Sequence, residues 1–410
     1  MKILTITNLF PPEFIGGYEL LMLEIVTMLA NKGHEIIVAT SPLVNHSESG
    51  HTNGIQIRRE LSYTGLSLDP PQSNEKLKST YINMGNIAVI RRIIEEFKPD
   101  RILLGNIDGL GAIGIISFLH DCGMNTVLYL ADNPFSEIEQ SKQTWHDFVK
   151  LYRADRALKN LQVIVISQGI LDEIINALGL SLGFANLIPG TVSSSEAKKE
   201  RDLISKTGYR FVFCSRVAPH KGIHIVIDAA RKLIELGENN FQIDIFGGGN
   251  IPDLLQKAHA YGLGNHIRYG GLVGREEMLD RYAEYDALLF PTWMREPLGL
   301  VAIEAAAKGC IPILTAQTGA AEWLPSTDCI KIERTAEGLA GGMQRVMYLP
   351  PHEKERIRNS LKRNIAEYFG NARWHPRIER VLVELPESKI NVNPRTVEDA
   401  FFAILCTWRG

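Results

Sequence analysis

The hydrophobic positions at the start of the chain form short β-branched runs separated by an amphipathic stretch. An apolar run over residues 2–7 is followed by a loop with two prolines and two glycines, an amphipathic stretch over 18–32, and a second apolar run over 35–40. A strand, a helix and a strand in this order predict a βαβ unit, and such units build parallel sheets. Residues 102–104 and 126–130 are predicted to be further buried strands.

The same pattern begins again after Gly190. Residues 192–207 are polar, serine-rich and charged, which is typical of a linker. A helix is then predicted over 222–236. The strands predicted in this half are residues 209–214, 242–246, 287–290 and 311–314. Two successive α/β halves predict two domains, and parallel sheets of this kind bind ligands beyond the carboxyl ends of their strands.

We therefore expect a first Rossmann-like domain over residues 1–190, a second over 191–373, and a final segment over 374–410 that crosses back to the first domain. Within that segment, 374–385 and 396–406 are predicted helices. The apolar face of the last helix is expected to pack onto the first domain; it consists of Phe401, Phe402, Ile404 and Leu405. A polar stretch with prolines, over 62–79, is predicted to be a loop.

Net charge, cysteine spacing and the length of apolar runs limit the classes of function that this chain can have. The 410 residues carry a formal net charge of -3, which gives no argument for a nucleic-acid partner. The five cysteines are odd in number and none is spaced as CxxC, which argues against a zinc site or a disulfide framework and favours a cytoplasmic protein. No apolar run reaches the ~18 residues of a membrane span. We expect contact with a membrane to be peripheral at most, at its inner face.

The sharpest chemical signal is the segment 295–305, which reads REPLGLVAIEA and follows a predicted strand. Pro297 is expected at the first position of a helix, where its missing N–H costs nothing. The backbone N–H groups then expected to face a ligand are those of Leu298, Gly299 and Leu300. A helix N-terminus of this kind holds an anion such as a diphosphate, and a glycine lets the anion approach closely.

Two carboxylates flank this predicted anion site. Glu296 lies just before the predicted helix and Glu304 about two turns inside it. Carboxylates with this separation can accept hydrogen bonds from hydroxyls at opposite ends of one ligand. An amphipathic helix with two ordinary glutamates is the alternative.

Two cations follow the first strand of the second half. Arg216 and Lys221 lie in the turn SRVAPHKG between the predicted strand and helix. A guanidinium fork and a mobile ammonium together suit a pyrophosphate leaving group. A solvated basic turn is the alternative.

Glycine-rich turns follow several strands. Gly16 and Gly17 lie in the first strand–helix loop, where the backbone could approach a ligand, but the GxGxxG dinucleotide fingerprint is absent. Gly247 opens a run of three glycines, and Leu272 follows another glycine pair; both turns could shape a slot for a base. Plain tight turns explain each of them equally well or better.

Taken together, these motifs resemble retaining glycosyltransferases of family 4, which adopt the GT-B fold: two Rossmann-like domains with parallel sheets that face each other across a deep cleft. The resemblance covers nearly the whole chain. It rests on Gly16-Gly17, Ile188-Pro189-Gly190, Ser215 to Gly222, Phe246 to Gly249, Asp286, Pro291, the pair Glu296 and Glu304, and Gly319 to Glu322.

The resemblance implies a role for each residue. Arg216 and Lys221 would hold the donor diphosphate, Glu296 would bind hydroxyls of the donor sugar, and Glu304 would bind the ribose. Further donor contacts are implied for Gly16, Gly17, Gly247, Leu272, Pro297, Leu298, Gly299 and Leu300. A nucleoside diphosphate sugar would be the co-substrate, with neither a metal ion nor a cofactor. UDP-glucose is the favoured donor and GDP-mannose the next.

One departure from the family pattern affects the expected activity. Ala131 takes the place of a histidine that the family often has, which leaves Asp132 and Asn133 as candidates to contact the sugar. A protein that binds the sugar nucleotide without transfer is therefore one alternative, and a nucleotide-sugar epimerase or hydrolase of the same architecture is another. The acceptor implied by the resemblance is a saccharide or a lipid-linked saccharide of a polysaccharide or glycoconjugate.

Overall fold

The chain divides into two compact units. Unit 1 contains residues 1–188 and 375–410, and unit 2 contains residues 189–374. The structure is a computed structural model that describes residues 1–43, 50–52, 54–64, 81–136, 138, 142–192, 208–293, 296–384 and 392–408. The predicted linker over 192–207 and the predicted loop over 62–79 therefore lie almost wholly outside the described residues.

Unit 1 is built on an eight-stranded sheet with the order β3-β4-β2-β1-β5-β6-β7-β8. Every pair is parallel except β3 with β4, which is antiparallel. The strands are β1 Lys2–Ile6, β2 Glu35–Thr40, β3 Gly50–Thr52, β4 Ile55–Arg59, β5 Arg101–Leu104, β6 Thr126–Leu130, β7 Gln162–Val165 and β8 Phe184–Leu187. Because β1, β5 and β6 are almost entirely buried, their sequences are continuous apolar runs rather than alternating ones.

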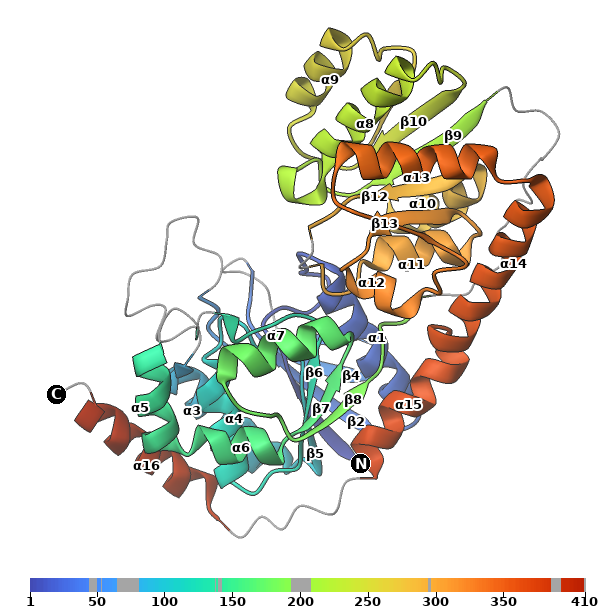
Figure 1. The fold of residues 1–410 in the computed structure, drawn as a ribbon. Coiled ribbons are helices and arrows are strands. Elements are labelled where there is room, and N and C mark those ends of the chain that lie inside the picture. Colours follow the sequence, from blue (N-terminus) through green and yellow to red (C-terminus); the bar gives the residue numbers. More distant parts are fainter. Residues whose placement is uncertain are drawn as a thin grey trace. The chain divides into compact units, whose positions relative to one another are not determined.

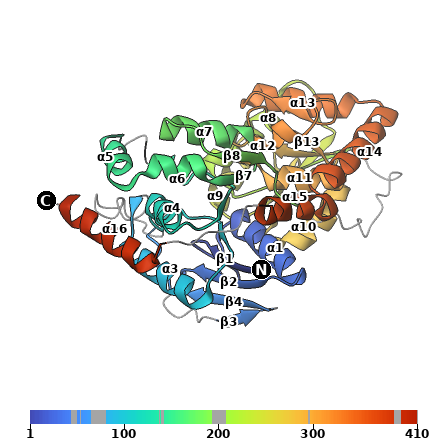
Figure 2. The same ribbon diagram turned by 90° about the horizontal axis from the view of Figure 1, so that it is seen from below.

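The helices of unit 1 connect these parallel strands or return to them from the C-terminus (Figure 1). They are α1 Gly17–Asn31, α3 Met84–Phe97, α4 Ala112–Asp121, α5 Lys142–Tyr152, α6 Ala154–Asn160, α7 Gln168–Leu178, α15 Asn371–Val383, whose first residues still belong to unit 2, and α16 Pro394–Trp408. Figure 2 shows α16 alongside α3, and α16 also packs on α4.

The last helix corrects one expectation about its apolar face. Phe401 is buried and its ring packs edge-on against Tyr152 at 4.9 Å between centroids, whereas the neighbouring Phe402 is 58% exposed. Successive residues of a helix point about 100° apart, so the face that packs on unit 1 follows the spacing of Val397, Phe401 and Leu405 instead.

Unit 2 contains a six-stranded, wholly parallel sheet with the order β11-β10-β9-β12-β13-β14. Its strands are β9 Tyr209–Cys214, β10 Phe241–Phe246, β11 Ile267–Gly271, β12 Ala287–Phe290, β13 Ile311–Thr315 and β14 Ile330–Ile332. Its helices are α8 Ile223–Glu235, α9 Ile251–Ala260, α10 Arg275–Arg281, α11 Leu300–Ala307, α12 Gly319–Trp323, α13 Ala336–Tyr348 and α14 Pro351–Tyr368, with short 3-10 turns η3 Pro219–Lys221 and η4 Tyr282–Glu284.

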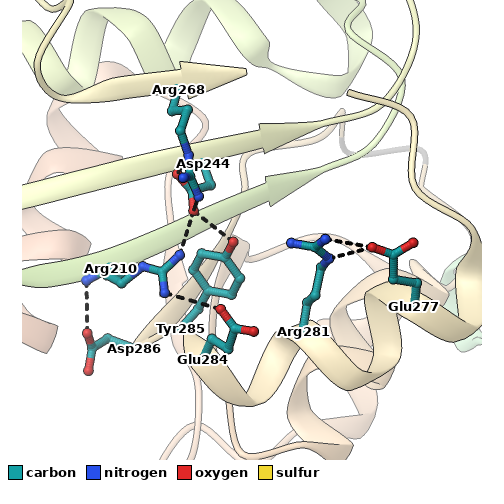
Figure 3. Close-up of polar contacts among 8 residues, drawn as sticks. All are labelled: Arg210, Asp244, Arg268, Glu277, Arg281, Glu284, Tyr285 and Asp286. Atoms are coloured by element: carbon teal, nitrogen blue, oxygen red, sulfur yellow. Dashed lines mark hydrogen bonds and ion pairs between the residues drawn. The ribbon is translucent and has the colours of Figure 1, made fainter. Parts of the chain in front are cut away.

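A buried acidic residue joins three strands of the second sheet. Asp244 on β10 is fully buried and accepts hydrogen bonds from Arg210 on β9, Arg268 on β11 and the hydroxyl of Tyr285, which precedes β12 (Figure 3). Burial alone would raise the pKa of Asp244, but these partners hold the pKa below its usual range. The network satisfies a charge that would otherwise be costly to bury.

No helix within the described residues is long and apolar enough to cross a membrane. None of the five cysteines, all of which lie within the described residues, forms a disulfide, and only Cys406 is exposed.

Candidate active site

Two loops of unit 2 are joined at the carboxyl ends of β9 and β12. Gly222, in a left-handed conformation, lies so close to Pro291 that an added Cβ would be 2.0 Å from the Pro291 carbonyl oxygen. The N–H of Trp293 donates to the carbonyl of His220 at 2.9 Å. The Arg334 guanidinium donates to the carbonyls of both loops, at 3.2 Å to Pro291 and 2.9 Å to Pro219. These contacts hold the two loops in one arrangement.

A third loop fixes the segment that leads into α11. The N–H of Gly319 donates to the Glu296 carbonyl at 3.0 Å, and a Cβ at Gly319 would be 1.9 Å from the Pro297 carbonyl oxygen. The hydroxyl of Thr315, at the end of β13, donates to the Thr292 carbonyl at 2.8 Å. The backbone before the helix is therefore held by close contact with the chain that follows β13.

The start of this helix differs from the sequence prediction. Helix α11 begins at Leu300 with Gly299 as its N-cap, so Pro297 is not its first residue and Leu298 lies before it. Gly299 has a φ of 80°, and a Cβ there would be 2.7 Å from the Phe290 ring. The fold itself requires this glycine. The N–H groups at the start of the helix are those of Leu300 and Val301, and Glu304 lies little more than one turn inside it.

The two loops bring Lys221 and Glu296 together. Their side chains form an ion pair and are 14% and 13% exposed. The Thr292 hydroxyl donates to the same Glu296 oxygen at 3.0 Å. Sequence reasoning assigned these two residues to different parts of the ligand, and the structure places them in direct contact. The pair has almost no net charge and is half-buried. The loops that follow β9 and β12 hold it in place.

Arg216 provides a cation without such a partner. Its side chain is exposed, and among the described residues no ion pair is formed by its guanidinium. The neighbouring His220 ring packs against Trp293 at 5.4 Å between centroids. Burial, followed by the charges of Lys221 and Arg216, lowers the pKa of His220, so this histidine stays neutral beside the two cations.

Glu304 lies in a second, deeper part of the site. Its side chain is 8% exposed, and Oε1 accepts a hydrogen bond from Nε of Arg275 on α10 at 2.6 Å. Burial raises the pKa of Glu304, and Arg275 opposes this effect. Cys214 and Tyr282 are close enough for the Glu304 charge to raise the pKa of each, in both cases after burial as the main cause.

The glycine run after β10 packs against the Arg216 turn. A Cβ at Gly247 would be 2.0 Å from the Ser215 carbonyl oxygen, and one at Gly249 would be 2.3 Å from that of Val217. These glycines are needed for backbone contact within the unit, which is a sufficient reason for their presence. Leu272, after β11, is 80% exposed.

In unit 1, the glycine pair lies at the start of α1. The N–H of Gly16 donates to the Glu19 carboxylate at 2.9 Å, which caps the helix that Gly17 begins. Gly16 has an extended backbone, and the nearest atom to an added Cβ is that carboxylate at 3.9 Å. Neither the backbone conformation nor the packing of unit 1 requires a glycine at Gly16, in contrast to Gly247 and Gly299.

Asp132 and Asn133 follow β6 and differ in exposure. The Asn133 amide is buried; it donates to Glu173 at 2.9 Å and accepts from the N–H of Phe135 at 2.9 Å. Asp132 is partly exposed and accepts from the N–H of Asn133 at 2.7 Å. Of the two, Asp132 is therefore better placed to meet a ligand. Within the described residues, no group of three or more His, Cys, Asp or Glu side chains is arranged to hold a metal ion.

Comparison with known proteins finds a likeness in the second unit. Residues 194–363 match the family model described as Glycosyl transferases group 1. The matched residues include Arg216, Lys221, Glu296 and Glu304, so the matched region contains these four site residues of unit 2.

Other proteins resemble the chain over most of its length. Glycogen synthase of Mycobacterium tuberculosis is 24% identical over 398 residues, which cover 90% of this chain and 91% of that protein. Among solved structures, sucrose-phosphate synthase from Thermosynechococcus elongatus has a TM-score of 0.70 at 18% identity and covers 93% of this chain and 98% of its own. Anabaena HepE in complex with UDP-glucose has a TM-score of 0.67 at 18% identity and covers 94% of this chain and 100% of its own.

These likenesses confirm the predicted fold class, an α/β fold with two Rossmann-like units of the GT-B type. The predicted cleft between the two units stays a prediction.

Sequence reasoning missed several residues that build the candidate site. Arg275 and Thr292 contact the two predicted carboxylates, and Arg334 joins the loops that carry Lys221 and Glu296. Thr292 could have been found, since it lies four residues before Glu296 in the same predicted loop. Arg275 and Arg334 carry no such signal, because their partners are distant in sequence.

Proposed function

We propose that the protein is a retaining, metal-independent glycosyltransferase of family 4 that transfers a hexose from a nucleoside diphosphate sugar, with UDP-glucose as the favoured donor. The observation that carries this proposal is the placement of Arg216, the Lys221–Glu296 pair and buried Glu304 at one edge of the second sheet, inside the region that matches the glycosyltransferase group 1 model. Glycogen synthase and HepE with UDP-glucose, both similar to this chain, are consistent with a hexosyl donor.

The charges of the site suit a diphosphate. Arg216 is exposed and makes no ion pair within the described residues, so its planar fork can bind phosphate oxygens without first losing a protein partner. Lys221 supplies a second positive charge, and the N–H groups of Leu300 and Val301 have no carbonyl to bond within α11. Together these groups stabilise the negative charge of the diphosphate, which is the task a metal ion performs in other transferases.

The two carboxylates suit the two sugars of the donor. Glu296 is held by Lys221 and Thr292, and its position beside the ammonium would bring a hexose hydroxyl next to the bound phosphate. Glu304 lies deeper, next to Cys214 at the end of β9, and would accept hydrogen bonds from the ribose hydroxyls. Gly247 and Leu272 would border the base. Contacts of the donor with Gly16, Gly17 and Asp132 stay predictions of the sequence.

Transfer with retention follows from attack on the face from which the diphosphate departs. The acceptor oxygen forms a bond to the anomeric carbon while the bond from that carbon to the diphosphate oxygen breaks. The acceptor hydroxyl proton passes to the departing diphosphate oxygen, so no protein base is needed. Arg216 and Lys221 stabilise the charge on that oxygen as it develops, and such an interaction typically lowers the barrier by ~3 kcal/mol.

The acceptor is proposed to be a saccharide or a lipid-linked saccharide used in polysaccharide or glycoconjugate synthesis. Glycogen synthase, as a relative, is the support for a saccharide acceptor. We expect the protein to act in the cytoplasm, with peripheral contact with the inner membrane face at most.

A thermal-shift panel of UDP-, GDP- and ADP-sugars tests the donor. A donor present at about 100 times its Kd stabilises the protein by ~2.7 kcal/mol and should raise the Tm by several degrees. The shift should appear for one base class, with UDP-glucose the strongest, and should shrink in Arg216→Gln. The matched control is Arg231→Gln, which removes an exposed arginine of α8 that pairs with Glu235. Absence of a shift with all three classes contradicts the proposal.

Turnover separates the proposal from its two alternatives. NMR of the product should show the anomeric configuration of the donor, and activity should persist in EDTA. Donor binding without transfer to any saccharide would favour a binding protein, and Ala131 is the residue that motivates this alternative. A changed free sugar formed without acceptor would favour an epimerase or hydrolase.

A further inference from the structure

Glu304 has only one of its two carboxylate oxygens occupied. Oε1 accepts from Arg275 Nε at 2.6 Å, and Oε2 has no hydrogen-bond partner among the described residues. An ionised carboxylate can accept about four hydrogen bonds, and a buried one is costly to leave unsatisfied. A carboxylate that is 8% exposed and bonded on one oxygen therefore has unused acceptor capacity for a ligand with hydroxyl groups.

Arg275 differs from its partner in exposure. Its side chain is 46% exposed, and it is the first residue of α10, directly after the loop that follows β11. The guanidinium pairs with Glu304, and Cys214 and Tyr282 are close enough for the Glu304 charge to raise the pKa of each, after burial as the main cause. Arg275 is the only cation paired with Glu304 within the described residues.

Resting on the proposed function, we propose that Arg275 is a positioning residue for donor selection: its contact with Oε1 holds the Glu304 carboxylate so that Oε2 accepts a ribose hydroxyl, and so makes the site prefer ribonucleotide over 2′-deoxyribonucleotide donors. A neutral glutamic acid would offer a donor and a weaker acceptor, and an unanchored carboxylate would lose its orientation. Either change should weaken recognition of the ribose and leave the diphosphate contacts of Arg216 and Lys221 intact.

The pH dependence of this preference gives the proposal its distinctive signature. The titratable groups facing Glu304 are Arg275 from α10, the Cys214 thiol from β9 and the Tyr282 hydroxyl from η4. Burial raises the pKa of Glu304, and Arg275 is the one group that lowers it. Removing Arg275 therefore raises the pKa of Glu304. As pH falls, the variant should lose its ribose preference at a higher pH than the wild type does.

Competition binding provides the test. The probes are UDP, GDP and ADP, each beside its 2′-deoxy analogue, with Kd measured by calorimetry from pH 5.5 to 9 on the full chain. The variants are Arg275→Gln, Arg275→Lys and Glu304→Gln. The matched control is Arg281→Gln, at the other end of α10, whose arginine pairs with Glu277 (Figure 3).

For the nucleotide bound most tightly, the wild type should prefer the ribose form by about tenfold or more, the value of one hydrogen bond to a charged acceptor. Arg275→Gln should show a weaker preference than the wild type and, as pH falls, should lose it at a higher pH than the wild type does. Arg275→Lys should retain it better than Arg275→Gln, Glu304→Gln should lack it at every pH, and Arg281→Gln should match the wild type.

The outcomes distinguish this inference from the function on which it rests. If the wild type binds none of the three nucleotides, the proposed function fails and the inference fails with it. If the wild type prefers the ribose form and Arg275→Gln keeps both that preference and the wild-type pH profile, only the role of Arg275 is overturned. A change in Tm without a change in the preference also overturns it, because a purely structural ion pair would behave in that way.

Discussion

Replacing Gly319 by alanine tests whether the close backbone contact before α11 determines activity. A Cβ at this position would lie 1.9 Å from the Pro297 carbonyl oxygen and 2.6 Å from its carbonyl carbon. Both obstacles are backbone atoms, so no side chain can rotate out of the way. To reach even 3.0 Å, the shortest separation that real Cβ contacts tolerate, the two segments must move apart by at least about 1.1 Å.

This movement has two expected consequences. The hydrogen bond from Gly319 to the Glu296 carbonyl, 3.0 Å long, would be stretched or lost together with local packing, which we expect to destabilise the protein by about 1–3 kcal/mol. The displaced segment carries Glu296 and leads directly into the N-terminus of α11. A misplacement of about 1 Å in a reacting group can cost on the order of a hundredfold in rate, so kcat/KM should fall by about that factor.

The assay compares kcat/KM for sugar transfer with Tm and the far-UV circular dichroism spectrum. Gly341→Ala is the matched control, since Gly341 lies on an exposed face of α13 and has no atom within 4 Å of an added Cβ. That control should keep full activity and gain up to about 1 kcal/mol of stability. A Gly319→Ala protein with unchanged activity and Tm would refute the reasoning, because the contact would then be able to relax without consequence.

Three further predictions concern charge and thiol chemistry. Lys221→Gln should lower kcat/KM by about a hundredfold while the spectrum of the folded protein is unchanged, as measured by steady-state kinetics and circular dichroism. Asp244→Asn should lower the free energy of unfolding at pH 7 by about 2–3 kcal/mol, less than for a fully buried pair because Arg268 reaches solvent. Since the pKa of Asp244 is lowered by folding, its stabilisation is full above pH ~4 and is lost as pH falls below that value, so urea midpoints of wild type and variant should converge in acid. A thiol reagent at pH 8 should modify exposed Cys406 first, because burial raises the pKa of Cys122 to about 12, and Cys406→Ser should remove the fast phase.

Many strands of both sheets could be predicted from the sequence because they are short apolar runs whose neighbours are polar. The runs at 35–40, 126–130, 209–214 and 287–290 have the predicted bounds. Parallel strands that are buried on both faces give this signal irrespective of the rest of the fold. Strands β3, β4, β7, β8 and β14 were not predicted. Strand β3 has only three residues and β8 is largely exposed, so neither forms a buried apolar run.

The start of α11 could not be predicted because a contact between distant residues decides it. Pro297 has the local signature of a first helical residue, and no neighbour in sequence contradicts this interpretation. The helix does not begin at Pro297 because Gly319 binds Glu296 and because Gly299, with positive φ, packs against Phe290. The residue types of the site were therefore predictable, whereas the geometry that presents them depends on chain segments some twenty residues away.

The second sheet contains two buried carboxylates whose surroundings are opposite in kind, and this difference separates structure from function. Asp244 is bound by two arginines and a tyrosine, so nothing remains for a ligand to satisfy (Figure 3). Glu304 is bound by one arginine through one oxygen. A carboxylate oxygen without a protein partner keeps its capacity to accept hydrogen bonds from a ligand. The carboxylate with the fewer partners is thus the one expected to recognise the donor.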